Sequence, residues 1–403
     1  MIVTIIIFVV VIAVLIFVHE LGHFLFARWA GIRVDAFAIG FGPSLWSKKV
    51  TSAKHGDTTY SINAIPFGGY VKIFGENGDD IEDSGEEKDN GDESASAVPA
   101  TSSGSRSFVN KPRHIQAAVL FAGILFNFIF AWIILSGAFM AGLPVSAEDY
   151  AQYSSRFRDE RVLIVDVSPG SPGALAGLQA GDAIVSISSN ANSGASLSIA
   201  DIKSVVDQSA GTPVTVGYIP TGMSTSDISK NPAEIKTVIL TPVKGIADIP
   251  AGSYAIGIAM DNAATLSLPP LLAAKEGARY TWNAIEATVF GVGSLIAAAF
   301  QHNSAVLSEV SGPVGIASLV GQAVENGWTN LILLTAVISI NLGVLNLLPF
   351  PALDGGRILF VAIEAIIRRP IKAKITNAVN TVGFALLILL MLVVTYHDII
   401  KLI

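Results

Sequence analysis

The stretch IIIFVVVIAVLIFVHELGHFLF, residues 5–26, sets an unbroken apolar run directly before two histidines and a glutamate. About 20 apolar residues in a helix span the ~30 Å hydrocarbon core of a bilayer. Ionisable side chains at that depth are costly and tend to mark function. The stretch therefore predicts a membrane helix over residues 1–27 that carries His19, Glu20 and His23. No Lys or Arg precedes it and no small-residue cleavage site follows it, so we expect a retained helix and not a signal peptide.

The composition indicates a membrane protein with more than one folded part. The chain has 403 residues, of which 51% are hydrophobic and only 14% are charged, whereas soluble domains carry about 25% charged residues. Because the chain contains no cysteine, disulfides and thiolate ligands are excluded. Any metal must then be held by His, Asp or Glu.

The apolar stretches together predict a polytopic α-helical membrane protein with four transmembrane helices. A further apolar stretch, residues 281–300, is interrupted by Glu286 and could either span the bilayer or lie in its interface as an amphipathic helix. The four predicted spans cover residues 1–27, 115–143, 329–356 and 377–397.

Basic residues predict how these spans are oriented. Lys and Arg are frequent in residues 28–75 and in the stretch RRPIKAK, residues 368–374, and short basic flanks stay on the cytoplasmic side. Both termini and the segment between the second span and residue 280 then face outward. Within that segment, residues 160–262 contain alternating strand-like runs such as RVLIVDV and IKTVILTPV, which predict a β-rich external domain.

Residues 76–107 differ in kind from the rest of the chain. From Glu76 to Glu93 there are ten acids against the single Lys88, a surplus that exceeds the net charge of −7 of the whole chain. The remainder of the segment is rich in Ser, Gly and Ala, and such a composition cannot bury enough apolar surface to fold. We expect a disordered tether, although an acidic run could also attract a basic tail of a substrate.

The sequence HELGH has the spacing of a zinc site. Its two histidines lie four residues apart and therefore on one face of a helix, and the adjacent Glu20 can reach a water beside the metal. Catalytic zinc takes three protein ligands, and Asp354 is the candidate for the third, in NLLPFPALDGG, residues 346–356. Asp354 could alternatively only cap a following helix. If Asp354 is a ligand, residues 281–300 should lie in the interface, because another crossing would carry Asp354 to the opposite side.

Several motifs resemble the site-2 protease family of intramembrane zinc metalloproteases, most closely its bacterial regulator-of-sigma-E type. The likeness is spread over almost the whole chain. It rests on HELGHFLFARWAGIRVDAFAIGFGP (19–43), PFGGYVKI (66–73), FAGILFNF (121–128), SPGSPGALAGLQAGD (168–182), SGPVGIA (311–317) and NLGVLNLLPFPALDGG (341–356).

The resemblance implies a Zn²⁺ cofactor held by His19, His23 and Asp354, with Glu20 as the general base. It implies substrate contacts at Asn346, at Asn127, and along the tip of a membrane-associated β-hairpin formed by Phe67, Gly68, Gly69, Tyr70 and Val71. The family commonly has proline where this chain has Ile124, so Asn127 could serve packing instead of substrate contact. The likeness also implies that the β-rich domain is a single PDZ domain, which could bind peptides or act as a size filter.

The resemblance further implies a multi-pass protein of the bacterial inner membrane with its active site near the cytoplasmic side and its PDZ-like domain outside. Its partners would be the lipid bilayer and single-span membrane proteins, such as a trimmed anti-sigma factor or a signal-peptide remnant. No nucleic-acid partner is expected. The alternative is a zinc transporter or a non-catalytic scaffold, neither of which needs a base beside the first ligand.

Overall fold

A computed structural model describes residues 2–52, 56–76, 106–189, 192–193, 198–209, 211–221, 235–245, 253–301, 312–325 and 327–402. The chain forms two compact units. The membrane unit comprises Met1–Leu135, Gly277–Val324 and Ile332–Ile403, and the β-rich unit comprises Ser136–Glu276 and Glu325–Leu331. Each unit is described separately below.

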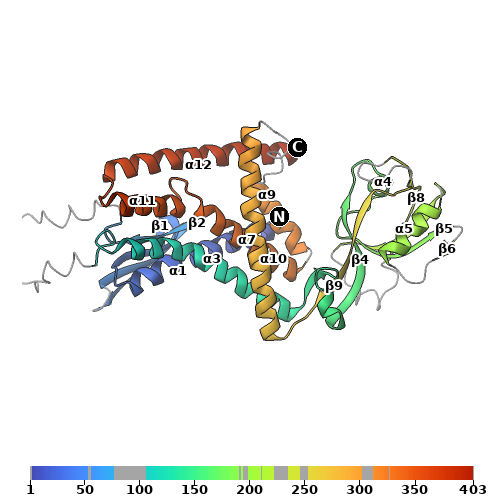
Figure 1. Ribbon diagram of the computed structural model, residues 1–403, viewed down its shortest axis with the longest axis horizontal. Coiled ribbons are helices and arrows are strands. Elements are labelled where there is room, and N and C mark those ends of the chain that lie inside the picture. Colours follow the sequence, from blue (N-terminus) through green and yellow to red (C-terminus); the bar gives the residue numbers. More distant parts are fainter. Residues whose placement is uncertain are drawn as a thin grey trace, which may run out of the picture. The chain divides into compact units, whose positions relative to one another are not determined.

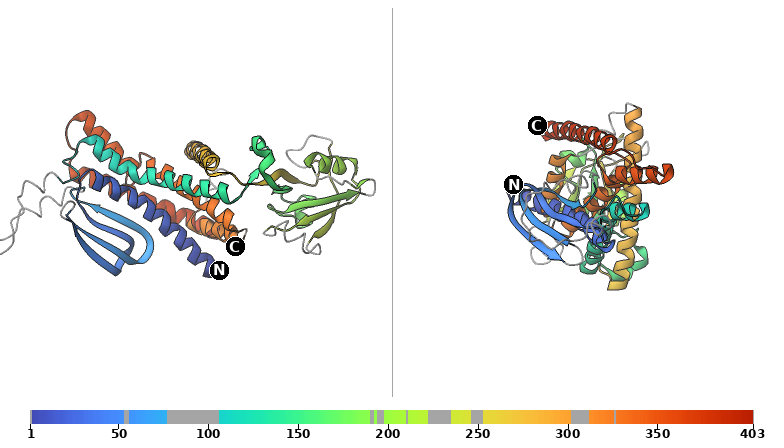
Figure 2. Two further views of the ribbon diagram at one scale, coloured as in Figure 1. Left: turned by 90° about the horizontal axis from the view of Figure 1, so that it is seen from below. Right: turned by 90° about the vertical axis from the view of Figure 1, so that its left-hand side faces the viewer.

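Four helices among the described residues are long and apolar enough to cross a membrane, as the hydropathy pattern predicts. Two of them, α1 and α3, lie side by side (Figure 2). Gly22 permits this close approach, because a Cβ there would overlap the carbonyl oxygen of Ala122. The four helices are α1 (Ile2–Trp29), α3 (Arg113–Ala141), α10 (Trp328–Leu347) and α12 (Ala373–Leu402).

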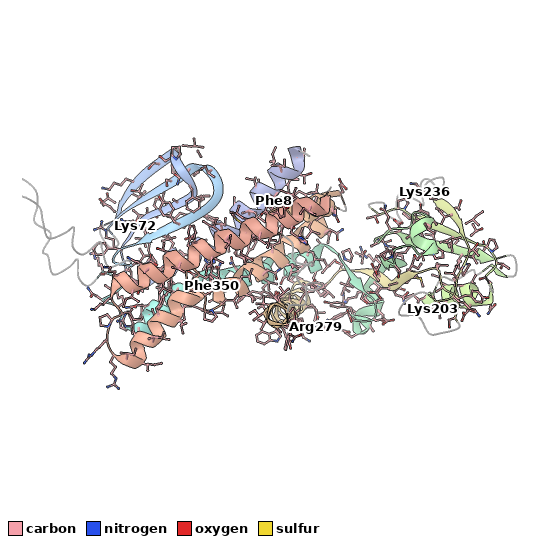
Figure 3. The ribbon with its side chains drawn as sticks, turned by 90° about the horizontal axis from the view of Figure 1, so that it is seen from above. Phe8, Lys72, Lys203, Lys236, Arg279 and Phe350 are labelled. Carbon is pink, nitrogen blue, oxygen red and sulfur yellow. The ribbon has the colours of Figure 1, made fainter. Side chains whose placement is uncertain are left out.

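The third span is shorter than the predicted 329–356. Helix α10 ends at Leu347 and a separate helix, α11 (Asp354–Ile367), follows it. The prolines at 349 and 351 cannot donate backbone hydrogen bonds, so the helix cannot continue through them. The connecting segment, marked by Phe350 in Figure 3, contains Ala352 with a positive φ of 72°, which is a strained conformation for a residue other than glycine.

Helix α7 (Pro270–Phe300) begins well before the predicted residues 281–300. It is not among the helices that qualify as membrane spans. Its membrane-unit part crosses the other helices of that unit and does not run alongside them (Figures 1 and 2). Tyr280, Ala284 and Ile285 pack there against a cluster formed by α3 and α10.

Within the same unit, α9 (Pro313–Glu325) is anchored by Asp398, which accepts hydrogen bonds from the backbone N–H groups of Gly312 and Gly315.

A β-sheet formed by β1 (Val34–Ser52) and β2 (Gly56–Ile73) packs against α1. Residues 36–39 of β1 pair with residues 69–72 of β2 and also with residues 59–62. All pairings of residues 69–73 run to residues 34–39, so this segment, marked by Lys72 in Figure 3, is an outer strand of the sheet. The prediction that residues 66–73 form a hairpin tip is therefore wrong for residues 69–73, which pair along their length with residues 34–39.

The β-rich unit contains a seven-stranded sheet of order β3-β9-β4-β5-β7-β8, with β6 paired to β5. Its described short helices are the 3₁₀ helix η2 (Ala151–Arg156), α4 (Pro172–Leu175) and α5 (Ile199–Gln208), and α5 begins with a capping box between Ser198 and Asp201. The buried core is apolar and includes Ile164, Ile202 and Val216. The strands are β3 (Leu143–Ser146), β4 (Phe157–Val167), β5 (Ala183–Ser189), β6 (Asn192–Ser193), β7 (Val214–Ile219), β8 (Lys236–Leu240) and β9 (Ile258–Leu266).

The predicted domain boundaries of 160–262 are too narrow. Strand β3 lies before them and β9 continues past them, and the two strands pair from Leu143 with Leu266 to Ser146 with Ala263. A local strand pattern cannot show that distant segments join one sheet.

Most of the predicted disordered segment, residues 77–105, lies outside the described residues.

Candidate metal centre

Three side chains that can hold a metal converge in the membrane unit. The Asp354 Oδ2 atom lies 3.0 Å from His19 Nε2 and 3.3 Å from His23 Nε2, and the two Nε2 atoms are 3.2 Å apart. Tetrahedral ligands of zinc at 2.0–2.1 Å lie about 3.3 Å from one another. The three atoms therefore have the separation that a zinc ion requires, and both histidines are buried, with 8% and 7% exposure.

Local structure explains how each ligand reaches this point. His19 and His23 lie one turn apart on α1, so their rings share a face. Asp354 is the first residue of α11, whose N-cap is Leu353 and lacks a side-chain cap. Its carboxylate contacts both histidines, which favours the predicted ligand role over the alternative that Asp354 merely caps this helix.

Helix α3 contacts the outer sides of both histidine rings. The Nδ1 atom of His23 lies 2.9 Å from the carbonyl oxygen of Val119, and the Nδ1 atom of His19 lies 3.1 Å from the side-chain amide of Asn127. Between them on α3 is Gly123, where a Cβ would overlap His23 Nε2. A larger residue at 123 would therefore push the rings out of place.

Glu20 faces a small cavity beside the three ligands. The cavity has a volume of about 170 Å³. The outer strand of the β-sheet reaches it: Tyr70 and Val71 contribute to its wall, and a Cβ on Gly69 would lie 3.4 Å from Glu20 Cγ. The complete lining is His19, Glu20, His23, Tyr70, Val71, Ile73, Glu76, Leu120, Asp354 and Arg357.

The predicted site residues lack Ile73, the last residue of the motif PFGGYVKI, and three lining residues outside that motif: Glu76, Leu120 and Arg357. Glu76 and Arg357 form an ion pair with a 2.6 Å separation, so Glu76 is not part of a free tether. Arg357 lies three residues after Asp354 on α11 and thus on the same helical face, a spacing that could have identified it. The same three residues also line a second cavity of about 430 Å³, and they therefore form a shared wall between the two cavities.

The other residues that were predicted to contact substrate do not line the small cavity among the described residues. Asn346 is half-buried on the last turn of α10 and does not line the small cavity, as far as the described residues show. Asn127 is fully buried behind His19. Gly68 forms the turn into the outer strand with a φ of 120°, and the side chain of Phe67 lies outside the described part of the chain.

Comparison with known proteins places this centre in a family. The model of peptidase family M50 matches residues 7–390. A protein of Clostridium perfringens, described provisionally as a zinc metalloprotease, is 33% identical over 96% of this chain and 95% of its own length. The zinc metalloprotease RasP of Geobacillus kaustophilus is 31% identical over 99% of this chain and 98% of its own. RasP of Shouchella clausii is 30% identical over 99% of both chains.

Proposed function

The chain belongs to peptidase family M50 and is a membrane-embedded zinc metalloprotease, and from this premise we propose that it cuts single-span membrane proteins within their transmembrane segments. The single observation that carries the proposal is the adjacency of three elements. The metal-binding triad, the side chain of Glu20 and the outer strand 69–73 border one cavity.

The residues of the cavity divide into ligands and a base. His19, His23 and Asp354 would hold the zinc, which would make water nucleophilic near neutral pH and polarise a carbonyl oxygen. Glu20 lies next to the first ligand in sequence but outside the group of three ligand atoms. Its carboxylate accepts a proton from the attacking water and passes it to the nitrogen of the leaving amine.

The outer strand provides the means to hold the substrate. A transmembrane helix keeps its carbonyl groups in internal hydrogen bonds, so it must unwind before any of them can react. A strand edge can pair with an extended peptide through backbone hydrogen bonds. Residues 69–73 use one edge to pair with residues 34–39, and their opposite edge would receive the unwound segment beside Glu20. Asn346, at the end of α10, would contact the same segment farther from the metal.

The surroundings of the site fit the proposed cellular setting. The centre lies toward the basic end of α1, where Arg28 and then Arg33 follow the histidines, and short basic flanks face the cytoplasm. The β-rich unit would then be on the outer face of a bacterial inner membrane, acting as a PDZ-like filter or peptide binder. Its groove of about 520 Å³ between α5 and residues 253–260 could accept a chain end. Trimmed anti-sigma factors and signal-peptide remnants are the proposed substrates.

A trapping experiment tests this proposal against a zinc transporter or a passive scaffold. The Glu20→Gln variant, expressed in place of the natural chain, should accumulate uncut membrane fragments, which mass spectrometry would identify. Purified protein in lipid vesicles should cut those fragments inside their apolar segments. If the purified protein cuts them only outside these segments, or not at all, the proposal of intramembrane cleavage fails.

A further inference from the structure

The two histidines of the metal centre have unequal partners on α3. His23 Nδ1 contacts a backbone carbonyl, that of Val119, at 2.9 Å. His19 Nδ1 contacts a side chain, the amide of Asn127, at 3.1 Å. A substitution can remove the side-chain partner of His19, whereas no substitution removes the backbone carbonyl that His23 contacts.

The geometry fixes which nitrogen of each ring faces the metal. Both Nε2 atoms point toward Asp354, so the Nε2 lone pairs are the ones available to zinc. A neutral imidazole that offers Nε2 carries its proton on Nδ1. Each Nδ1–H then needs an acceptor, and such partners fix the ring orientation and raise the basicity of the ligand.

Asn127 has an acceptor to offer. It is fully buried, with 0% exposure, and its Oδ1 atom has no hydrogen-bond partner among the described residues. A buried acceptor without a donor is costly. A half-turn of the amide about its Cβ–Cγ bond exchanges the positions of Oδ1 and Nδ2. Oδ1 would then accept the hydrogen bond from His19 Nδ1–H.

The backbone of Asn127 is itself held in place. Its carbonyl oxygen accepts a hydrogen bond of 2.9 Å from the Ser339 hydroxyl on α10. Gly123, one turn earlier on α3, leaves the space that the imidazoles occupy. Helix α3 therefore both makes room for the rings and carries the group that contacts His19.

We propose that Asn127 is a positioning residue of the zinc centre: its side-chain oxygen accepts the Nδ1 proton of His19 and so presents Nε2 to the metal. This inference rests on the proposed ligand set. It assigns Asn127 a role behind the ligand in place of contact with the substrate.

Zinc affinity of the full-length protein in detergent, measured by competition with a chromogenic chelator, tests the proposal. Asn127→Leu keeps the side-chain size but has no acceptor, and it should bind zinc about 10–100-fold more weakly. Asn127→Asp keeps an acceptor oxygen and should stay close to the natural protein. The visible absorption of the cobalt-substituted protein should change in the Leu variant and be retained in the Asp variant. Asn127→Ala provides a second loss-of-acceptor variant in case the Leu variant does not fold.

Two controls separate the possible failures. Thr288→Ala removes a hydrogen bond to Asn341 on α10 that does not involve Asn127 or a proposed ligand, and it should leave zinc affinity unchanged. His23→Ala should abolish tight zinc binding, and if it does not, the proposed ligand set itself is wrong. If His23→Ala loses zinc while Asn127→Leu or Asn127→Ala binds it as tightly as the natural protein, only the role of Asn127 is overturned. An Asp variant as weak as the Leu variant would equally contradict an acceptor role.

Discussion

The two units bury very different interiors. The hydrophobic core cluster of the β-rich unit consists of aliphatic side chains and one tyrosine. Buried polar side chains of this unit, such as Ser171 and Asp182, bond to nearby backbone groups. The centre of the membrane unit instead buries His19, His23, Asn127 and Ser339. Buried polar groups of this kind cost free energy unless they are paired, and here they are paired with one another around a metal site. The difference places the candidate metal site in the membrane unit, whereas the proposed role of the β-rich unit is selection of substrates.

Substitutions at the metal centre give the sharpest test of this division and the largest expected effect. Glu20→Gln should reduce cleavage by about 10²–10⁴-fold, because it removes the proton acceptor, while zinc stays bound by the three ligands. His23→Ala should lose both zinc and cleavage. Zinc content by elemental analysis and cleavage of a membrane-embedded substrate are the two measurements. A Glu20→Gln variant with normal turnover would contradict the assigned base.

Proline substitutions in the outer strand should have the next largest effect. Adjacent residues of an antiparallel strand direct their N–H groups to opposite edges of the strand. Tyr70 and Val71 both lie opposite residues 37–38, but the N–H group of only one of them points toward those residues. The N–H group of the other residue points to the free edge, where substrate would pair, and proline at that position removes this donor. Cleavage should then slow about tenfold, which corresponds to the loss of roughly one hydrogen bond to the substrate. That variant should keep its zinc content and thermal stability. Unchanged turnover in both Tyr70→Pro and Val71→Pro would show that substrate does not pair with this edge.

Excision of the β-rich sheet should change selection and leave catalysis intact. The cut belongs between Leu143 and Leu266, which are paired neighbours, so a short Gly/Ser linker can join the two ends. A cut at residues 161 and 244 would leave β9 without its neighbour β4. The variant should cleave trimmed substrates at the natural rate and also accept untrimmed ones. If it still discriminates between trimmed and untrimmed substrates, the filter role is wrong.

Replacement of residues 77–105 by a Gly/Ser linker should have the smallest effect. Glu76 must be kept, because its ion pair with Arg357 borders the cavity. An anionic run is repelled by the anionic membrane surface, at roughly −30 mV, and a passive tether should leave insertion and cleavage near normal. A loss confined to substrates with basic tails would instead support recruitment. High salt should then abolish the advantage of the natural chain. Ions screen charges beyond ~8 Å at physiological ionic strength, and this screening distance becomes shorter as salt is added.

The sequence by itself determined the features that depend on local periodicity and composition. Apolar runs located the four membrane helices, although proline chemistry ended the third one at Leu347, earlier than hydropathy alone indicated. The spacing of His19 and His23 placed two ligands on one face, because an α-helix repeats every 3.6 residues. The absence of cysteine limited the remaining ligand to a histidine or a carboxylate.

Only the tertiary structure decided which distant groups meet. Local patterns carry no information on packing between helices, so they left open whether Asp354 capped a helix or joined the histidines. They also could not show that strand 69–73 lies beside Glu20, that Glu76 pairs with Arg357, or that Asn127 lies behind His19. Each of these contacts joins segments far apart in the chain. They form because close helix packing at Gly22 and Gly123 brings α1 and α3 together and because the break after Leu347 turns Asp354 toward the two histidines.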